Sequence, residues 1–519
     1  MGKFIGLLCS LWLTSSLAVA LELTEREAAG QQLFTQGISA GGGEVIARVG
    51  ASGAQVPAAV VPCANCHGAD GRGRPEGGVR PPDITWRRLT MGFSTLASNG
   101  RTHPAYTDAS LARAVSEGID PGGNKLDPAM PRFIMSMRDM TNLTAYLKRL
   151  EEQRDPGVQS DVLRIGTLLP QQGPLAELGK VVGEVLEGAV NQVNQAGGIH
   201  GRQLQLLVAD AGSDRQSAER GLRSLLEDDQ VFALLSPLAP ALDGHYAELL
   251  EPTGVPLIGP LELKTEGPKS RLIFAPLPGV VEQLQALGKF ASQSLSPAPG
   301  TVLIVYEQQA SQQQLAQRLQ QRLQHDGWPN VQLQAYQTER LSDTAAQLAD
   351  ASTVFFLGLS NTFSELSARL NQAERHPYLL AVSAQVAGGA LGVAEGFNQR
   401  VFLAYPFVPS DWTPEGLKAL EEIREKSGLG NQHGALQVSA YCAALLLSEG
   451  LKRAGRDASR EKLVSALENL HNFRTGLTPQ LSFGPGQRVG ASGAHIVMVD
   501  SQAQRFQALG HYISVDSDF

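Results

Sequence analysis

Two thiols and an imidazole stand within five residues in the stretch "VPCANCHGADGRG", which covers residues 61–73. Cys63 and Cys66 are separated by two residues, and His67 follows the second cysteine directly. Side chains of these types can bind zinc, exchange electrons as a dithiol, or attach and ligate haem. The residues around the motif decide among these three chemistries.

The surrounding sequence favours covalent haem. A structural zinc site usually takes four ligands from two such cysteine pairs, and this chain has one pair. A thioredoxin-type pair opens a helix in a βαβ unit, whereas this motif follows a loop and precedes a glycine-rich segment. Thiols at i and i+3 face one side of a helical turn, so both can reach a porphyrin while His67 faces the iron. We therefore predict one haem c, bound through Cys63 and Cys66 and ligated by His67.

The second axial ligand is predicted to be Met130, in "DPAMPRF" at 127–133. It follows a loop and precedes a proline, which fixes the backbone there. The other candidates are Met91, Met135, Met137, Met140 and His103, of which the methionines at 135, 137 and 140 are expected to be core filler near the last helix. With both axial positions filled the iron has no open site, which favours electron transfer over catalysis. A peroxidase would need an open position or a second haem.

The segments around these residues have the periodicity of a small helical domain. Apolar residues recur at helical spacing in 23–39, 107–123 and 138–152, the last forming a closing helix. The first contains Gly30, Leu33, Phe34 and Gly37, spaced as G-x-x-L-F-x-x-G. This pattern, with the methionine loop, resembles class I c-type cytochromes, and the resemblance implies a small all-α cytochrome c domain over 21–153.

The resemblance also implies supporting contacts around the haem. The carbonyl of Pro82 would accept a hydrogen bond from His67 and so fix its tautomer. Trp86, Arg87 and Arg88 would meet the haem propionates, or else form an exposed basic loop. Residues 40–60 lengthen the gap before Cys63 relative to small cytochromes, and we expect an extra loop or hairpin there, near the haem edge.

A different pattern begins after a short polar linker at 154–160. Short runs rich in Val, Ile, Leu and Phe alternate with amphipathic stretches of 12–20 residues, such as 163–169 followed by 176–196. Strands alternating with helices predict parallel sheets covered on both faces. We expect two Rossmann-like α/β lobes within 161–519, the first about 161–278 and 409–472, the second about 279–408 and 473–519.

The opening of this part, residues 173–214, resembles type I periplasmic binding proteins of the Leu/Ile/Val kind. It contains Gly173-Pro174, Gly188-Ala189 and the run N-x-x-G-G-I-x-G-R ending at Arg202. The resemblance implies a ligand cleft at the carboxyl ends of the strands. Its residues would be Ser236, Leu238, Ala239, Tyr306, Ser383 and Gln385. Because the expected acidic partner for an amine is missing, a zwitterionic amino acid is an unfavourable ligand.

The whole chain is consistent with an exported protein. A basic start, a short apolar core and a small-residue cleavage site predict a signal peptide over 1–20, and thus a periplasmic protein without a membrane span in its mature form. The net charge of -8 argues against nucleic-acid binding. Cys9 lies in the signal, and Cys442 lies in an apolar helical run as a buried, inert thiol.

We expect an electron carrier rather than an enzyme. The haem domain would exchange single electrons with periplasmic redox proteins, and the second part would bind a small molecule or dock a partner. The resemblance implies a quinoprotein alcohol dehydrogenase as one such partner. The alternatives are a solute receptor for an ABC permease with an accessory haem domain, and a scaffold that binds nothing and presents the haem.

Overall fold

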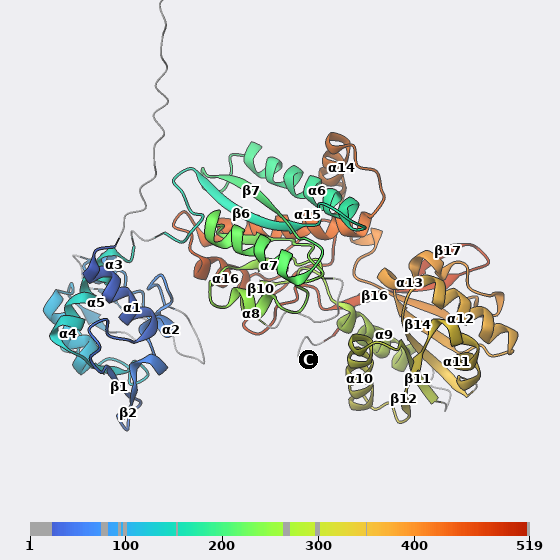
Figure 1. Ribbon diagram of the computed structural model, residues 1–519, viewed down its shortest axis with the longest axis horizontal. Coiled ribbons are helices and arrows are strands. Elements are labelled where there is room, and N and C mark those ends of the chain that lie inside the picture. The colour runs from blue at the N-terminus through green and yellow to red at the C-terminus, as the bar shows by residue number, and fades with distance from the viewer. Residues whose placement is uncertain are drawn as a thin grey trace, which may run out of the picture. The chain divides into compact units, whose positions relative to one another are not determined.

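The chain forms two compact units in a computed structural model, Met1–Arg154 and Asp155–Phe519 (Figure 1). The structure describes residues 23–73, 81–91, 95–96, 101–151, 154–262, 270–295, 301–348 and 350–515. The predicted signal peptide lies outside these residues.

The first unit contains the three predicted helices, each bounded by residues that suit its ends. The helices of this unit are α1 (Glu25–Gln36), α2 (Cys63–His67), α3 (Trp86–Leu89), α4 (Asp108–Glu117) and α5 (Met137–Arg149). Helix α1 starts with a capping box between Thr24 and Glu27, and α4 starts at the Thr107 cap. Both end where a glycine, Gly37 or Gly118, adopts a left-handed conformation that other residues rarely take.

The core of this unit is the crossing of α1 and α5. A Cβ atom on Gly30 would lie 2.0 Å from the carbonyl oxygen of Asn142, so only glycine lets the helices approach this closely. Phe34 and Tyr146 pack across the crossing with ring centroids 5.5 Å apart. The first and last helices of the unit are therefore in contact, although the cysteine motif lies between them in the sequence.

Short strands accompany the helices of the first unit. The segment 40–60 forms the predicted hairpin, with β1 (Ile46–Val49) antiparallel to β2 (Ala54–Pro57). Strand β1 also pairs with β5 (Arg132–Ile134), giving the order β2-β1-β5. A second pair joins β3 (Thr95–Leu96) to β4 (Thr102–His103). The hairpin is thereby tied to residues that closely follow Met130.

The second unit begins with a parallel sheet in the order β10-β9-β8-β6-β7. Its strands are β6 (Val162–Leu169), β7 (Gln203–Asp210), β8 (Ala233–Leu235), β9 (Leu257–Ile258) and β10 (Ile273–Phe274). The helices whose apolar residues enter its core are α6 (Ala176–Gln195), α7 (Arg215–Arg223), α8 (Tyr246–Leu250), α14 (Pro414–Ser427), α15 (Gly434–Ala454) and α16 (Arg460–Glu468). This is the first predicted lobe.

A second sheet, in the order β12-β11-β13-β14-β15-β16-β17, organises the other lobe. Its strands are β11 (Thr301–Glu307), β12 (Val331–Tyr336), β13 (Ala351–Leu357), β14 (Tyr378–Val382), β15 (Val401–Tyr405), β16 (Gly493–Asp500), β17 (Arg505–Ala508) and β18 (Ile513–Ser514), which pairs with β16. The first five strands in the order are parallel, and β16 and β17 continue the sheet as antiparallel strands.

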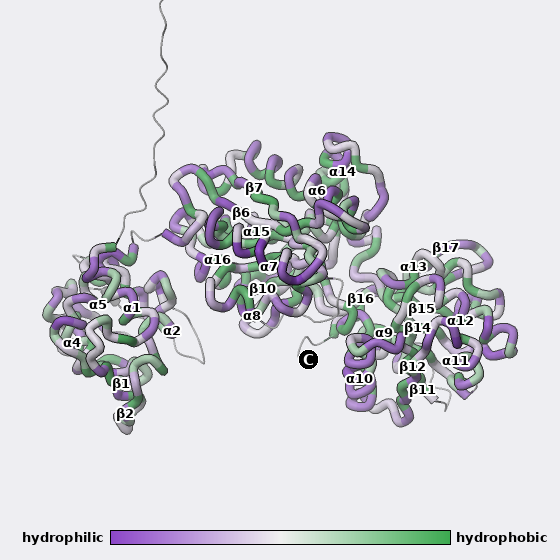
Figure 2. Tube along the Cα trace, viewed as in Figure 1, coloured by the Kyte–Doolittle hydropathy of each residue, from purple (hydrophilic) through white to green (hydrophobic). Residues whose placement is uncertain are grey.

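Both faces of this second sheet are buried, as a parallel sheet requires. Val302 and Ile304 face a core with α9 (Val280–Ser294) and α10 (Ala310–His325), while Leu303 and Val305 face the opposite core. The helices of that opposite core are α11 (Leu341–Gln347), α12 (Ser360–Gln372) and α13 (Ser383–Ala390). Figure 2 shows the corresponding contrast between hydrophobic strands and hydrophilic outer stretches of helices such as α10.

Two predicted boundaries are corrected by the packing. In the segment predicted as a linker, Val158 is buried in the core of the first sheet, and Asp155 accepts a 2.5 Å hydrogen bond from the backbone of Arg460. The segment therefore belongs to the second unit. Residues 473–491 were expected in the second lobe, but Leu477 and Phe483 are buried in the core of the first. This stretch returns to the first lobe before β16 begins, so its apolar side chains pack in the core of that lobe.

Helix α15 is long and rich in apolar residues. Among the residues that the structure describes, it is long and apolar enough to cross a membrane by length and composition. Two thirds of its most apolar stretch (67%) is buried in the protein, as expected of a core helix. Cys442 lies on this helix with no exposed surface, as predicted.

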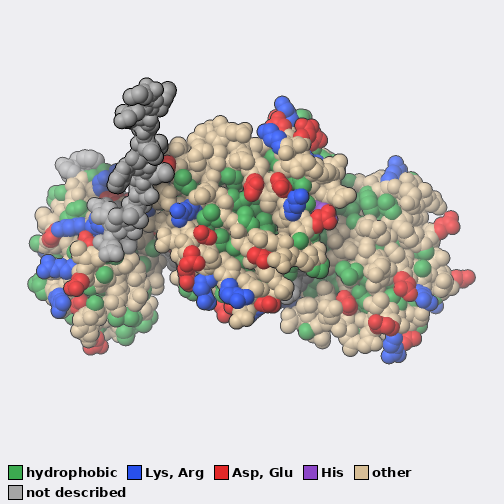
Figure 3. All heavy atoms as spheres, turned by 45° about the horizontal axis from the view of Figure 1, so that its top comes forward, with side chains coloured by type: hydrophobic (Ala, Val, Ile, Leu, Met, Phe, Trp, Pro, Cys, Tyr) green, Lys and Arg blue, Asp and Glu red, His purple; other side chains and the backbone are tan. Residues whose placement is uncertain are grey.

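Figure 3 shows positive and negative side chains interspersed on the face drawn, in keeping with the modest net charge.

Candidate functional site

The cysteine motif forms one short helix in the first unit. Helix α2 begins after Pro62 and ends at Gly68, whose φ of 76° turns the chain away. Cys63 is half-buried against the hydrophobic core, and Cys66 is exposed. Both thiols are free of disulfides. The sequence Cys-x-x-Cys-His therefore presents two thiols and one imidazole within little more than one helical turn.

The imidazole of His67 is buried and oriented by the backbone. Its Nδ1 lies 3.1 Å from the carbonyl oxygen of Pro82, the contact predicted from the sequence. A carbonyl can only accept, so Nδ1 carries the proton and Nε2 keeps its lone pair. Burial lowers the pKa of His67 below its ordinary value, and the hydrogen bond to Pro82 opposes this with a smaller effect. The ring is therefore neutral at pH 7, the form that ligates a metal.

These groups suit covalent haem. Burial raises the pKa of the Cys63 thiol to about 12, so the thiol is protonated at neutral pH. Within the described parts of the chain, no three His, Cys, Asp or Glu side chains gather as a metal-ion site. Two thiols on one turn beside a neutral imidazole with an available nitrogen match the donors that haem c takes.

Met130 lies at the end of a tight turn. Its backbone N–H donates to the carbonyl oxygen of Asp127 at 3.1 Å, and the carboxylate of Asp127 accepts from the N–H of Ala129 at 2.9 Å. The side chain of Met130 is half-buried. The turn holds the backbone that carries this thioether.

The alternative axial residues occupy different environments. Met140 is buried in the core, and Met135 packs against it, as expected of core filler. The prediction for Met137 is wrong, because this first residue of α5 is 82% exposed. His103 is half-buried, and its Nδ1 lies 2.9 Å from the carbonyl oxygen of Pro104. The Met91 sulfur accepts a hydrogen bond from Arg88 at 3.1 Å.

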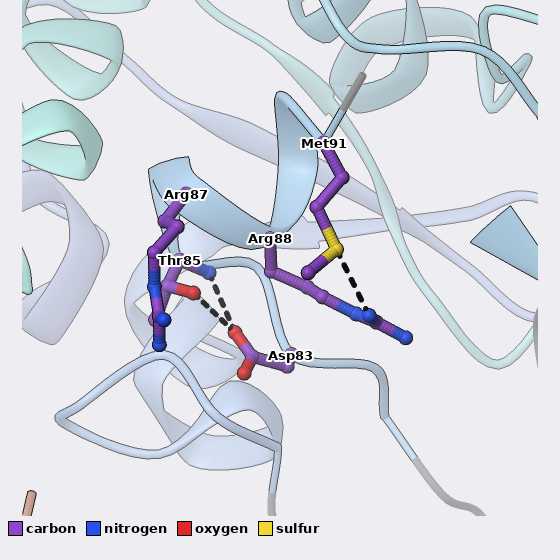
Figure 4. Close-up of a pocket in the computed structure, with 5 residues that line it drawn as sticks. All are labelled: Asp83, Thr85, Arg87, Arg88 and Met91. Atoms are coloured by element: carbon purple, nitrogen blue, oxygen red, sulfur yellow. Dashed lines mark hydrogen bonds between the residues drawn. The ribbon is translucent and has the colours of Figure 1, made fainter. Parts of the chain in front are cut away.

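A pocket of about 400 Å³ lies beside the segment that orients His67 (Figure 4). Its lining is Asp83, Thr85, Arg87, Arg88 and Met91. The backbone N–H and hydroxyl of Thr85 both donate to Asp83, at 2.9 and 2.6 Å. The stick view shows Arg88 reaching toward Met91. Two cations from one short helix therefore border this pocket.

The three residues expected to meet the propionates already have partners in the protein. The backbone N–H and Nε of Arg87 donate to Glu151 at 3.0 and 3.2 Å. The ammonium of Lys148 lies 4.8 Å from the ring centre of Trp86. Arg88 is exposed and contacts Met91 as described above.

The predicted cleft residues lie at strand ends in both lobes. In the first lobe Ser236 follows β8 directly, with its hydroxyl buried and without a hydrogen-bond partner among the described residues. Its φ of 44° is unusual for a residue other than glycine, and such conformations gather at functional sites. Leu238 and Ala239 are fully buried, so packing occupies their side chains.

In the second lobe the predicted residues come from two neighbouring elements. Tyr306 lies near the end of β11 and is buried in one core of the sheet. Ser383 is the first residue of α13, directly after β14, and Gln385 is the third residue of that helix. The side-chain amide oxygen Oε1 of Gln385 is buried, and no described residue donates to it. None of these side chains carries a charge.

Sequence reasoning missed the residues that brace the methionine loop. Arg132 donates to carbonyl oxygens of Leu126 and Met130, and Asp120 organises the turn after α4. Arg132 gives no signal in the sequence beyond its place two residues after Met130. The run "DPGGN" at 120–124 is a stronger signal, because aspartate and glycine at these positions favour a turn closed by the carboxylate.

Comparison with known proteins agrees with this division. The cytochrome c family model matches residues 51–151, and the family described as periplasmic binding protein matches residues 162–504. The chain therefore belongs to the periplasmic binding protein family and carries a cytochrome c domain ahead of the binding-protein domain. Membership of the cytochrome c family implies covalently bound haem c, and both families imply a periplasmic location.

Individual relatives match the second unit. A Leu-, Ile-, Val-, Thr- and Ala-binding protein of Pseudomonas aeruginosa is 21% identical over 323 residues, 59% of this chain and 82% of that protein. A Leu/Ile/Val-binding protein homolog of Brucella abortus is 23% identical over 338 residues, 61% of this chain and 83% of that protein. At this identity the relatives place the chain among binding proteins and leave its ligand open.

Solved structures show the same fold. A leucine-binding protein of Thermotoga maritima has a TM-score of 0.53 and 18% identity, covering 68% of this chain and 98% of its own. A fatty acid substrate-binding protein of Thermomonospora curvata has a TM-score of 0.53 and 17% identity, covering 70% and 95%. Because ligands as different as leucine and a fatty acid occur on this fold, fold alone does not define the ligand.

Proposed function

We propose that the protein is a periplasmic electron carrier whose first unit holds one haem c. Cys63 and Cys66 would bond the porphyrin, and His67 and Met130 would ligate the iron from opposite sides. The observation that carries this proposal is the buried, neutral imidazole of His67, which donates through Nδ1 to Pro82 at 3.1 Å. That hydrogen bond leaves Nε2 as the ligating atom and fixes the plane of the ring.

The protein groups have distinct tasks in this proposal. Haem, when bound, supplies a one-electron change of oxidation state. Helix α2 positions both thiols and His67, and the turn from Asp127 carries the thioether of Met130. If His67 and Met130 both hold the iron, no position would be left for a substrate, so we assign electron transfer rather than catalysis. Arg88, beside the pocket next to Asp83, would either meet a propionate or remain a solvated cation.

Replacing Met130 by alanine tests this assignment. Because a thioether ligand raises the potential of haem iron, Met130→Ala should lower it by roughly 0.1 V or more, within the ~0.8 V range that axial ligands set. The sulfur-to-iron absorption band of the oxidised protein should disappear as well. Spectroscopy and a redox titration of the full chain measure both effects.

Met137→Ala is the matched control for that experiment. Met137 lies seven residues further along, is 82% exposed, and should leave both spectrum and potential unchanged. A Met130→Ala protein with the wild-type spectrum would remove Met130 from the ligand role. Met91→Ala and Met135→Ala would then identify whether another methionine takes its place.

For the second unit we propose a binding or docking role that serves this electron transfer. The support comes from Ser236, with a left-handed backbone and a buried hydroxyl at the end of β8. Ser383 and Gln385 would add uncharged polar groups from the other lobe. A small, weakly charged molecule suits such groups better than a zwitterion, since buried charges without partners cost several kcal/mol (roughly 3–5).

The partners of the electron carrier follow from the same proposal. Redox proteins of the periplasm, such as a quinoprotein alcohol dehydrogenase, would donate or accept electrons. The alternative is a solute receptor for an ABC permease. A redox titration of the full chain, with and without ligands found by thermal-shift screening, distinguishes the electron-carrier role from the solute-receptor role. A shifted potential supports coupling, tight binding without a shift supports transport, and no binding supports a scaffold.

A further inference from the structure

The hairpin of the first unit is anchored to the strand that follows Met130. Strand β1 pairs antiparallel with β5, placing Ile46 opposite Ile134 and Arg48 opposite Arg132. The cytochrome c family match begins at residue 51, so β1 lies outside the matched region. Strand β5 starts two residues after Met130. This sheet therefore fixes the backbone on the C-terminal side of the methionine.

One side chain of β5 reaches back across the methionine loop. The guanidinium of Arg132 donates to the carbonyl oxygens of Leu126 at 2.9 Å, Asp127 at 3.3 Å, and Met130. It packs against Gly118, where a Cβ atom would lie 1.8 Å from Nε, so the glycine makes room for it. Arg132 thus connects the start and the end of the loop that carries the thioether.

The chain before the loop is held by a second charged group. Asp120 is buried, and its carboxylate accepts from the backbone N–H groups of Gly122 and Asn124, both at 2.9 Å. Arg101 pairs with the same carboxylate at 2.7 Å. The N–H of Leu126 donates to the carbonyl of Gly118 at 2.8 Å. The loop therefore leaves a fixed turn and arrives at a fixed strand, and Arg132 closes it between them.

We propose that Arg132 is a positioning residue that keeps the Met130 loop closed on the haem iron. This inference rests on the proposed ligand role of Met130. A loop without the guanidinium leaves three carbonyl oxygens to water and loses its link between Leu126 and Met130. The open conformation, in which Met130 would no longer hold the iron, should then become more populated. An external ligand competing for the same position binds more tightly when that population rises.

Imidazole binding to the oxidised full-length protein measures the open population. Arg132→Ala should tighten the apparent imidazole affinity by about tenfold or more relative to wild type. Arg132→Lys keeps the charge and part of the hydrogen bonding, so its change should be smaller. Arg48→Ala removes an exposed cation directly opposite Arg132 in the sheet and should leave the affinity within about twofold of wild type.

The outcomes separate this inference from the proposed function. Unchanged imidazole affinity in Arg132→Ala, with the sulfur-to-iron band intact, would overturn the positioning role and leave Met130 as ligand. Equal tightening in Arg48→Ala would overturn it too, because charge alone would then account for the effect. A Met130→Ala protein that binds imidazole no more tightly than wild type would instead refute the ligand assignment. If Arg132→Ala does not fold, Arg132→Lys supplies the comparison.

Discussion

The imidazole of His67 combines burial, a fixed tautomer and a neutral charge. Its hydrogen bond to Pro82 was expected from the resemblance to small cytochromes, and the 3.1 Å contact is present. The role of Met130 remains a proposal, and its support is the turn that holds its backbone. Arg132 could not be foreseen, because its contacts join carbonyl groups of three other residues and depend on how the loop folds back.

Cys442 offers a prediction about a single thiol. It is fully buried on α15, and burial raises its pKa to about 12. The thiol form therefore persists up to that pH, and at pH 8 the thiolate fraction is about a thousandfold below that of a free cysteine with pKa near 8.5. Iodoacetamide should not label it in the native protein and should label it after denaturation.

Mass spectrometry of the haem-bearing, signal-free protein reads this out directly. Haem attachment would block Cys63 and Cys66, so one label should appear per denatured chain. Labelling of the native protein at the rate of a free thiol such as glutathione would show that α15 does not bury this side chain.

Hydrophobic periodicity predicts the helices and strands of this protein wherever a segment is long and has clear end signals. The predicted strand at 163–169 is β6 at 162–169, and the predicted helix at 176–196 is α6 at 176–195. Short elements such as β10 were missed, since two residues give no periodicity. The return of 473–491 to the first lobe was also missed, because the packing partner of a short apolar segment is set by tertiary structure.

The crossing of α1 and α5 gives a prediction for the first unit. Gly30→Ala places a methyl group 2.0 Å from the carbonyl oxygen of Asn142 and 2.7 Å from the Cβ of Tyr146. The helices must separate, which should lower the free energy of unfolding by about 1–3 kcal/mol. Denaturant unfolding followed by haem absorbance measures this change.

Gly41→Ala is the matched control for the helix crossing. A Cβ atom there meets only the hydroxyl of Ser39 among the described residues, at 3.6 Å, so the unfolding midpoint should stay close to wild type. If Gly30→Ala had the stability of Gly41→Ala, the close approach of the two helices would be wrong.

The two units have separate cores, so haem attachment and the folding of the binding-protein domain should be independent. The core of α1 and α5 contains residues from the first unit alone, and the cores of the two sheets contain residues from the second alone. The division into a cytochrome c domain and a binding-protein domain was predictable because each has its own motif and periodicity. The ligand was not, because the same fold accepts chemically different molecules.

The decisive measurement is the number of haems per chain. The whole protein is produced by export in a host that attaches haem c. Intact mass and absorbance should show one covalent haem per chain. Cys63→Ala combined with Cys66→Ala should lose it, while the unfolding transition of residues 155–519 stays unchanged. A colourless wild-type protein, or covalent haem that survives both substitutions, would contradict the assignment of this chain as a haem-bearing electron carrier.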